Sequence, residues 1–106
     1  MAKKNVEIIV HEFVKALKTH NIRVDKAVLF GSYAKNSANS DSDIDIAIIS
    51  PDLGKNFVKE AVFLKKISQD IDLDISPRPY SAEEYKKADH GLFLFDEIIC
   101  KGKIID

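Results

Sequence analysis

Two aspartates, Asp43 and Asp45, stand at the beginning of an apolar run that extends to Ile49. If this run is a β-strand, both side chains lie on one face, about 6.6 Å apart along the strand. Two carboxylates placed in this way can share a cation, and without one their like charges would repel. Oxygen-only ligands suit Mg²⁺, and no His or Cys lies near enough in the sequence to indicate zinc. The pair therefore predicts a magnesium site.

A glycine-serine dipeptide, Gly31-Ser32, ends the apolar run that precedes these aspartates. Glycine has no Cβ, so it permits a tight turn and a close approach of the backbone to a ligand. If residues 32–35 begin a helix, its N–H groups would point at an anion such as the β- and γ-phosphates of a nucleoside triphosphate. Tyr33 either lines the nucleotide site or packs, and Lys35 either adds positive charge or is solvated. A phosphate-binding turn beside a magnesium site is typical of nucleotidyl transfer.

Residues 31–36 (Gly-Ser-Tyr-Ala-Lys-Asn) and 42–45 (Ser-Asp-Ile-Asp) resemble the signature of the DNA polymerase β-like nucleotidyltransferase superfamily, and specifically of its minimal nucleotidyltransferase branch. The spacing from the glycine to both aspartates fits that signature. Lys35 stands where arginine is common, and lysine lacks the bidentate fork of arginine. Asn36 stands where glycine is common, and asparagine tolerates the left-handed backbone conformation better than most residues. The resemblance implies an α/β (α+β) fold with a short mixed β-sheet backed by helices, over nearly the whole chain.

The same resemblance implies a third carboxylate on a neighbouring strand, which completes the metal site and acts on the acceptor hydroxyl. Residues 72–76 are predicted as that strand, and they supply Asp72 and Asp74. The two have the same parity, so the strand pattern cannot separate them. We favour Asp74, because it stands deeper in the apolar run, where burying a carboxylate without a function is costly. Asp72 remains the substitute.

Local patterns predict the elements around the site. Apolar residues recur at helical spacing over 6–17 and over 57–67, and Ser81 followed by Glu84 matches a capping box at a helix start. Residues 77–79 (Pro-Arg-Pro) predict an extended exit from the strand before them. The predicted order is a helix at 4–19, strands at 27–30 and 44–50, a helix over 57–67, a strand at 72–76, a short helix after residue 81, a helix at 92–99 and a strand at 103–105.

Arg78 follows the strand that carries the third carboxylate. It either contacts phosphate or pairs with Glu83, and the sequence favours neither. The single cysteine, Cys100, lies in an apolar run and is more typical of core packing than of a nucleophile.

Length and composition limit what surrounds the site. With 106 residues, the chain is expected to form a single domain spanning 1–106, and 45% apolar with 31% charged residues is typical of a soluble globular protein. The net charge of −1, without a basic run, argues against bulk nucleic-acid binding. No apolar segment approaches the roughly 20 residues of a membrane span. We therefore expect a cytoplasmic protein without a membrane partner.

The resemblance implies a nucleotidyltransferase that moves a nucleoside monophosphate, with AMP from ATP as the expected case, to an acceptor hydroxyl. Asp43, Asp45 and Asp74 would hold two Mg²⁺ ions, and residues 31–33 with Lys35 would bind the nucleotide. Minimal proteins of this branch typically pair with a helical HEPN toxin, and the implied acceptor is a tyrosine of that partner. Two alternatives remain open: nucleotidylation of a small molecule such as an antibiotic, and an inactive nucleotide- or partner-binding module.

Overall fold

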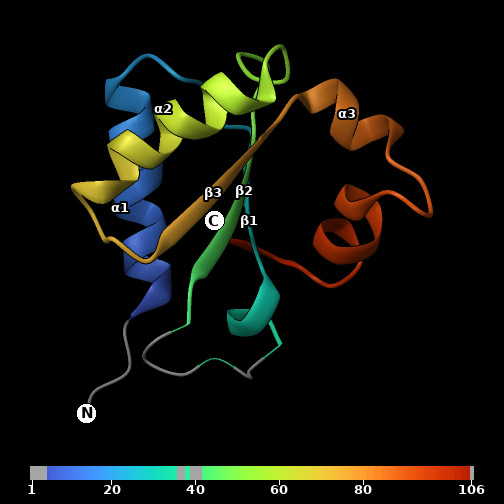
Figure 1. Ribbon diagram of the computed structural model, residues 1–106, viewed down its shortest axis with the longest axis horizontal. Helices are drawn as coiled ribbons and strands as arrows, with labels where there is room; N and C mark the ends of the chain where they lie inside the picture. The colour runs from blue at the N-terminus through green and yellow to red at the C-terminus, as the bar shows by residue number, and fades with distance from the viewer. Residues whose placement is uncertain (1–4, 36–37, 39–41, 106) are drawn as a thin grey trace.

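The computed structural model describes residues 5–35, 38 and 42–105. One four-stranded sheet runs through the middle of the molecule in the order β3-β2-β1-β4. Helices α1 and α2 cover one face of the sheet, and α3 and η2 lie on the other (Figure 1). The elements are α1 (Val6–Thr19), β1 (Lys26–Phe30), η1 (Gly31–Tyr33), β2 (Ile44–Ile49), α2 (Phe57–Gln69), β3 (Ile75–Tyr80), α3 (Ala82–Lys87), η2 (Leu94–Ile99) and β4 (Lys103–Ile105). This is the mixed sheet with helices that the resemblance implies.

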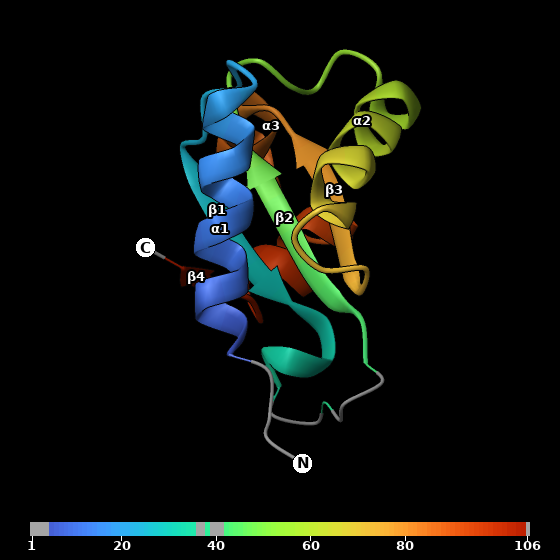
Figure 2. The ribbon, with the colours of Figure 1, turned by 90° about the vertical axis from the view of Figure 1, so that its left-hand side faces the viewer.

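Helix α1 begins where Asn5 accepts a hydrogen bond from the Ile8 N–H at 3.2 Å, which satisfies one of the backbone donors at the helix start. Its apolar positions Val10, Phe13 and Leu17 are fully buried. Their spacing places them on one face of the helix, and Figure 2 shows that helix lying along the sheet beside α2. The helix predicted over residues 4–19 is confirmed from Val6 to Thr19, and residue 4 lies outside the described residues.

Strand pairing brings three chain segments to the same end of the sheet. β1 and β2 are antiparallel, with Phe30 opposite Asp45, so β1 ends where β2 begins. β2 and β3 are parallel, with Ile44 opposite Ile75, so β3 begins at that end as well. The last residue of β1 and the first residues of β2 and β3 are therefore neighbours. β4 pairs with β1 in the antiparallel direction, and the final strand predicted at 103–105 is confirmed.

The alternation of side chains along the strands divides the core in two. Ile44, Ile46 and Ile48 of β2 pack with the buried residues of α1 and α2. Ala47 and Ile49 belong to a smaller cluster on the opposite face, with buried residues from β1, β3 and η2. Asp45 has the parity of Ala47 and Ile49, so its side chain faces the side of the sheet that η2 covers.

The predicted boundaries of β3 are wrong. The strand begins at Ile75 rather than at residue 72, and the Pro77 and Pro79 positions lie inside it. The carbonyls of Asp74 and Tyr80 accept hydrogen bonds from β2, so even-numbered residues of β3 pair with β2 and odd-numbered ones face the open edge. Both prolines are odd-numbered, and a missing N–H costs nothing at an edge that has no partner strand.

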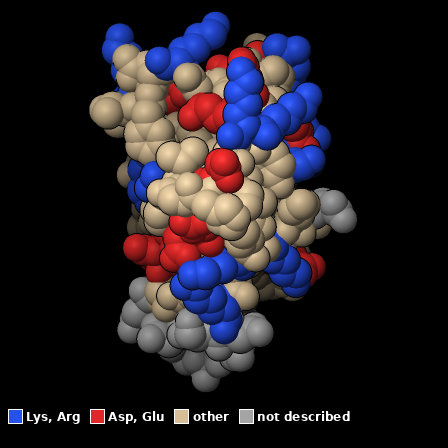
Figure 3. Space-filling view, turned by 90° about the vertical axis from the view of Figure 1, so that its right-hand side faces the viewer, with Lys and Arg blue, Asp and Glu red and all other residues tan. Residues whose placement is uncertain are grey.

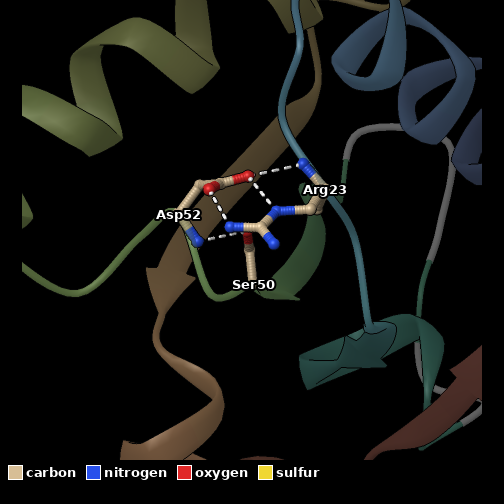
Figure 4. Close-up of polar contacts among 3 residues, drawn as sticks. All are labelled: Arg23, Ser50 and Asp52. Atoms are coloured by element: carbon tan, nitrogen blue, oxygen red, sulfur yellow. Dashed lines mark hydrogen bonds and ion pairs between the residues drawn. The ribbon is translucent and has the colours of Figure 1, made fainter.

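The connections at the far end of the sheet are joined by an ion pair. Arg23, between α1 and β1, donates from its Nη2 to Oδ1 of Asp52 at 2.7 Å and from its Nε to Oδ2 at 3.1 Å (Figure 4). Its backbone N–H also donates to Oδ2, and Ser50 Oγ accepts from the Asp52 N–H. These contacts tie the loop before β1 to the loop after β2.

The other predicted elements are confirmed with shifted ends. The predicted capping box is present, since Ser81 Oγ accepts from the Glu84 N–H and Glu84 accepts from the Ser81 N–H. The predicted helix at 92–99 is a shorter π-helical segment, η2. No helix in the described part of the chain has the length and apolar character needed to cross a membrane.

Candidate active site

Gly31 turns the chain at the end of β1, directly against Asp45. Its φ is 73°, a backbone conformation that L side chains rarely adopt, and a Cβ at this position would collide with Oδ2 of Asp45. The helix considered for residues 32–35 is a single 3₁₀ turn, in which the N–H groups of Ala34 and Lys35 both donate to the Gly31 carbonyl at 3.2 Å. Glycine is therefore required here by both conformation and space.

The two predicted metal ligands lie together at the start of β2. Asp45 is half-buried within the strand, and Asp43 is exposed immediately before it. Burial raises the pKa of Asp45, the negative charge of Asp43 raises it further, and the positive charge of Arg78 opposes both effects. Among the described residues, no donor forms a hydrogen bond with the Asp45 carboxylate. A divalent cation would relieve the repulsion and supply the missing partner.

The two candidates for the third carboxylate have different settings. Asp74 immediately precedes β3, and its carbonyl accepts the Ile44 N–H at 2.8 Å, so it neighbours the start of β2. Asp72 lies in the turn before it, where its Oδ1 accepts the Asp74 N–H at 2.9 Å. Across residues 5–35, 38 and 42–105, no three Asp, Glu, His or Cys side chains lie close enough together to hold a metal ion. The role of Asp74 as third ligand thus stays a prediction.

A small pocket of about 250 Å³ opens beside Gly31 and Asp45. It is lined by residues from five segments: Phe30, Gly31, Lys35, Asp45, Ser76, Arg78, Phe93 and Glu97. Lys35 lines this pocket, whereas Ser32 and Tyr33 are not among its lining residues, and the predicted roles of all three in nucleotide binding stay predictions. The alternative pairing of Arg78 with Glu83 is not present, because Glu83 forms its ion pair with Lys87 at 2.6 Å.

Four pocket residues were not predicted from the sequence as site residues: Phe30, Ser76, Phe93 and Glu97. Ser76 is opposite Asp45 in the register of β2 and β3, and it shares the strand parity of Asp72 and Asp74, so that parity could have found it. Phe93 and Glu97 come from the far end of the chain, and no local pattern marks them. Only the packing of η2 against β1 and β3 brings them to the pocket.

Charges of both signs surround the pocket. Glu97 forms an ion pair with Lys101 at 2.7 Å, and this hydrogen bond, with the Lys101 and Lys35 charges, lowers the pKa of Glu97. Figure 3 shows the face that carries α3 and η2, where basic and acidic groups alternate around an uncharged area. A continuous basic surface of the kind that tracks a nucleic-acid backbone is not visible on this face.

The chain matches the family model described as a nucleotidyltransferase domain over residues 10–96. It is 48% identical over 46 residues to a putative protein adenylyltransferase of Methanocaldococcus jannaschii, a match that covers 42% of this chain and 46% of that protein. The chain thus spans about half the length of that relative.

Solved structures share the fold. A crystal structure of a toxin-antitoxin with AMP-PNP has a TM-score of 0.65 and 24% identity, covering 94% of this chain and 72% of the other. A putative nucleotidyltransferase from Sulfolobus solfataricus has a TM-score of 0.60 and 16% identity, covering 98% and 89%. A variant of the toxin-antitoxin MntA-HpeT has a TM-score of 0.62 and 23% identity, covering 92% and 71%. With the family model covering most of its length, the chain belongs to the nucleotidyltransferase domain family.

Proposed function

We propose that this protein transfers a nucleoside monophosphate, AMP from ATP, to a hydroxyl group of a partner protein. The observation that carries the proposal is the contact between Gly31 and Asp45. It places the turn that would hold the phosphates directly against a half-buried carboxylate that has no hydrogen-bond donor among the described residues. Family membership and the name of the Methanocaldococcus relative, a putative protein adenylyltransferase, support the same reaction.

The residues at this pocket fit Mg²⁺. Asp43 and Asp45 offer oxygen ligands only, and the burial that raises the pKa of Asp45 leaves a carboxylate that gains from a nearby cation. Asp43, Asp45 and Asp74 would hold two ions, which would neutralise phosphate charge and lower the pKa of the acceptor hydroxyl. Asp74 would accept the proton of that hydroxyl.

The turn at Gly31 and Ser32 would position the triphosphate for in-line attack. The Asp45 carboxylate occupies the space that a Cβ at Gly31 would need, so it lies directly against this turn, and Ser32 would add a hydroxyl for a phosphate group. The acceptor oxygen forms a bond to the α-phosphorus, the bond from that phosphorus to the bridging oxygen breaks, and pyrophosphate leaves. Lys35 would contact the nucleotide from the same turn, whereas Tyr33 packs against the core cluster that includes Ile44 and Ile46.

For the acceptor we propose a tyrosine of a helical HEPN-type toxin, so that transfer would make this protein an antitoxin. Two structures with the same fold are of toxin-antitoxin complexes, and one of them is with AMP-PNP, which supports both the partner class and adenine as the base.

The test uses ATP labelled either at the α-phosphate or at the γ-phosphate, Mg²⁺, and the product of the adjacent gene, with mass spectrometry of the proteins. Label from the α-phosphate on a partner tyrosine is expected, and Asp45→Asn should abolish it while Arg23→Gln should not. Transfer only to added small hydroxylated compounds would favour the small-molecule alternative. Label from the γ-phosphate, or binding without any turnover, would contradict the proposed reaction.

A further inference from the structure

Arg78 is held in the wall of the pocket by aromatic side chains. Its Cζ lies 4.5 Å from the ring centroid of Phe93, 5.2 Å from that of Phe57 and 5.9 Å from that of Tyr80. Its Nε donates to the Tyr80 hydroxyl at 2.9 Å. These four residues, Arg78, Phe57, Tyr80 and Phe93, form what we call the Arg78 clamp. Contacts from three separate elements restrict the side chain, so little freedom remains to be lost on binding.

The positive charge of Arg78 has no acidic partner in the described part of the chain. The carboxylates there that form ion pairs do so with other cations, and Arg78 is absent from those pairs. Its charge nevertheless reaches the pocket, because it lowers the pKa of Asp45 against the effect of burial. The other arginine, Arg23, makes a bidentate pair with Asp52 at the far end of the sheet. Of the two arginines, Arg78 is therefore the one that is available to an anion at the site.

The clamp engages the Nε side of the Arg78 guanidinium group and leaves its two terminal nitrogens open. The Nε–H is taken by Tyr80, while no hydrogen bond or ion pair is found for either terminal nitrogen within the described residues. Two terminal N–H groups match two phosphate oxygens in a bidentate arrangement, which an ammonium group cannot reproduce. Lys35, the other cation at the pocket, is exposed on the turn and also acts on Glu97.

We propose that Arg78 binds the triphosphate of the nucleotide, through two hydrogen bonds from its terminal nitrogens to phosphate oxygens. This inference rests on the proposed function and extends it, since β3 then supplies the arginine fork that the turn after Gly31 lacks at Lys35. The phosphates lie between the carboxylates of β2 on one side and the Arg78 clamp on the other. Arg78 opposes the charge of the pyrophosphate as it leaves.

The test is calorimetric titration of the full chain with two probes, MgATP and magnesium tripolyphosphate, which has no nucleoside. Arg78→Gln should weaken binding of both probes by about tenfold or more, because a bidentate charged contact is lost. Arg78→Lys should recover only a small part, since lysine keeps the charge without the fork. Arg23→Gln, which removes the other arginine, should bind both probes like the wild type.

A fourth substitution keeps the test valid if Arg78→Gln fails to fold. Phe93→Leu leaves the arginine in place but loosens the clamp, so it should weaken the binding of both probes by a smaller factor than Arg78→Gln does. The melting temperature of each variant is recorded as well. Equal affinities of wild type and Arg78→Gln for both probes would overturn the inference and leave the proposed function standing. Weaker binding of MgATP with unchanged binding of magnesium tripolyphosphate would place Arg78 at the nucleoside, and this result would also overturn the inference. Failure of the wild type to bind MgATP would instead reject the proposed function.

Discussion

The contact between Gly31 and Asp45 joins two residues that lie far apart in the sequence into one structural unit. Gly31 has a positive φ, and any Cβ there collides with the Asp45 carboxylate. Both residues could be singled out from their types and spacing, because glycine at a strand end and paired aspartates at a strand start are local patterns. Their direct contact required the pairing of Phe30 with Asp45, which fixes the register of β1 and β2.

Gly31→Ala should therefore damage the site as well as the fold. The left-handed conformation costs a non-glycine residue about 1–2 kcal/mol, and the displaced Asp45 should weaken MgATP binding by about tenfold. Gly91→Ala is the matched control, because Gly91 also has a positive φ, 90°, but a Cβ there meets nothing within 4 Å. Denaturant unfolding and calorimetric titration measure the two effects. Similar loss of MgATP binding in both variants would exclude a specific role of the Gly31 contact.

The two candidate third carboxylates should separate on substitution. Asp74→Asn should abolish transfer, because the amide cannot accept the hydroxyl proton. Asp72→Asn should reduce transfer modestly, since the asparagine oxygen can still accept the Asp74 N–H that Asp72 holds at 2.9 Å. Rates of label transfer from ATP provide the measurement. An inactive Asp72→Asn with an active Asp74→Asn would reverse the assignment.

At the scale of elements, the ion pair between Arg23 and Asp52 should make stability depend on pH. The side-chain hydrogen bond from Arg23 lowers the pKa of Asp52 to about 2 from its ordinary 3.8. Because the folded-state pKa is the lower one, the unfolded chain binds more protons between these values. The contribution is fully present above about pH 4 and is lost as the pH falls towards 2.

Asp52→Asn should flatten this part of the stability profile, measured as the free energy of unfolding between pH 2 and 5. Arg23→Gln should flatten it less, because the backbone N–H of residue 23 still donates to Asp52 at 2.8 Å. The double variant should resemble Asp52→Asn. An unchanged profile in Asp52→Asn would show that the pair does not persist in solution.

Lys65 supports the open edge of β3. Its Nζ donates to the carbonyls of Leu73 and Ile75, two odd-numbered residues that face away from β2. Lys65→Met should lower the free energy of unfolding by about 1–2 kcal/mol, because charged hydrogen bonds to an exposed and a part-buried carbonyl are lost. Lys66→Met, at the exposed neighbouring position of α2, should change it by less than about 0.5 kcal/mol. Equal effects in chemical denaturation would contradict this role of Lys65.

The limits of sequence prediction are also visible in β3. Pro77 and Pro79 argued for an exit from the strand, because a proline in a central strand removes a ladder hydrogen bond. That argument fails at an edge strand, where alternate N–H groups need no partner. Edge position depends on the order β3-β2-β1-β4, which is a property of the whole sheet and has no local signal. The capping box at Ser81, by contrast, is set by residues three apart and could be predicted in full.

For the whole molecule, the helices and the sheet could be predicted because hydrophobic periodicity records which face of each element is buried. The pocket could be predicted only in part. Gly31, Lys35 and Asp45 come from the two segments with recognisable motifs, whereas Phe93 and Glu97 reach the pocket through the packing of η2 on the sheet. The aromatic contacts that fix Arg78 also depend on this packing.

The most direct test of the account is the stabilisation of the folded protein by MgATP. A ligand that binds only the folded state adds RT ln(1 + [L]/Kd) to the free energy of unfolding, about 2.7 kcal/mol at a hundredfold excess over Kd. The wild type should gain this amount with Mg²⁺ and ATP together. Asp43→Asn should lose most of the gain, while its stability without ligand stays equal or rises, because the exposed Asp43 charge no longer repels Asp45. A wild type that does not respond to MgATP, together with an Asp43→Asn variant that melts markedly lower without ligand, would make Asp43 a structural residue and contradict a nucleotidyltransferase site.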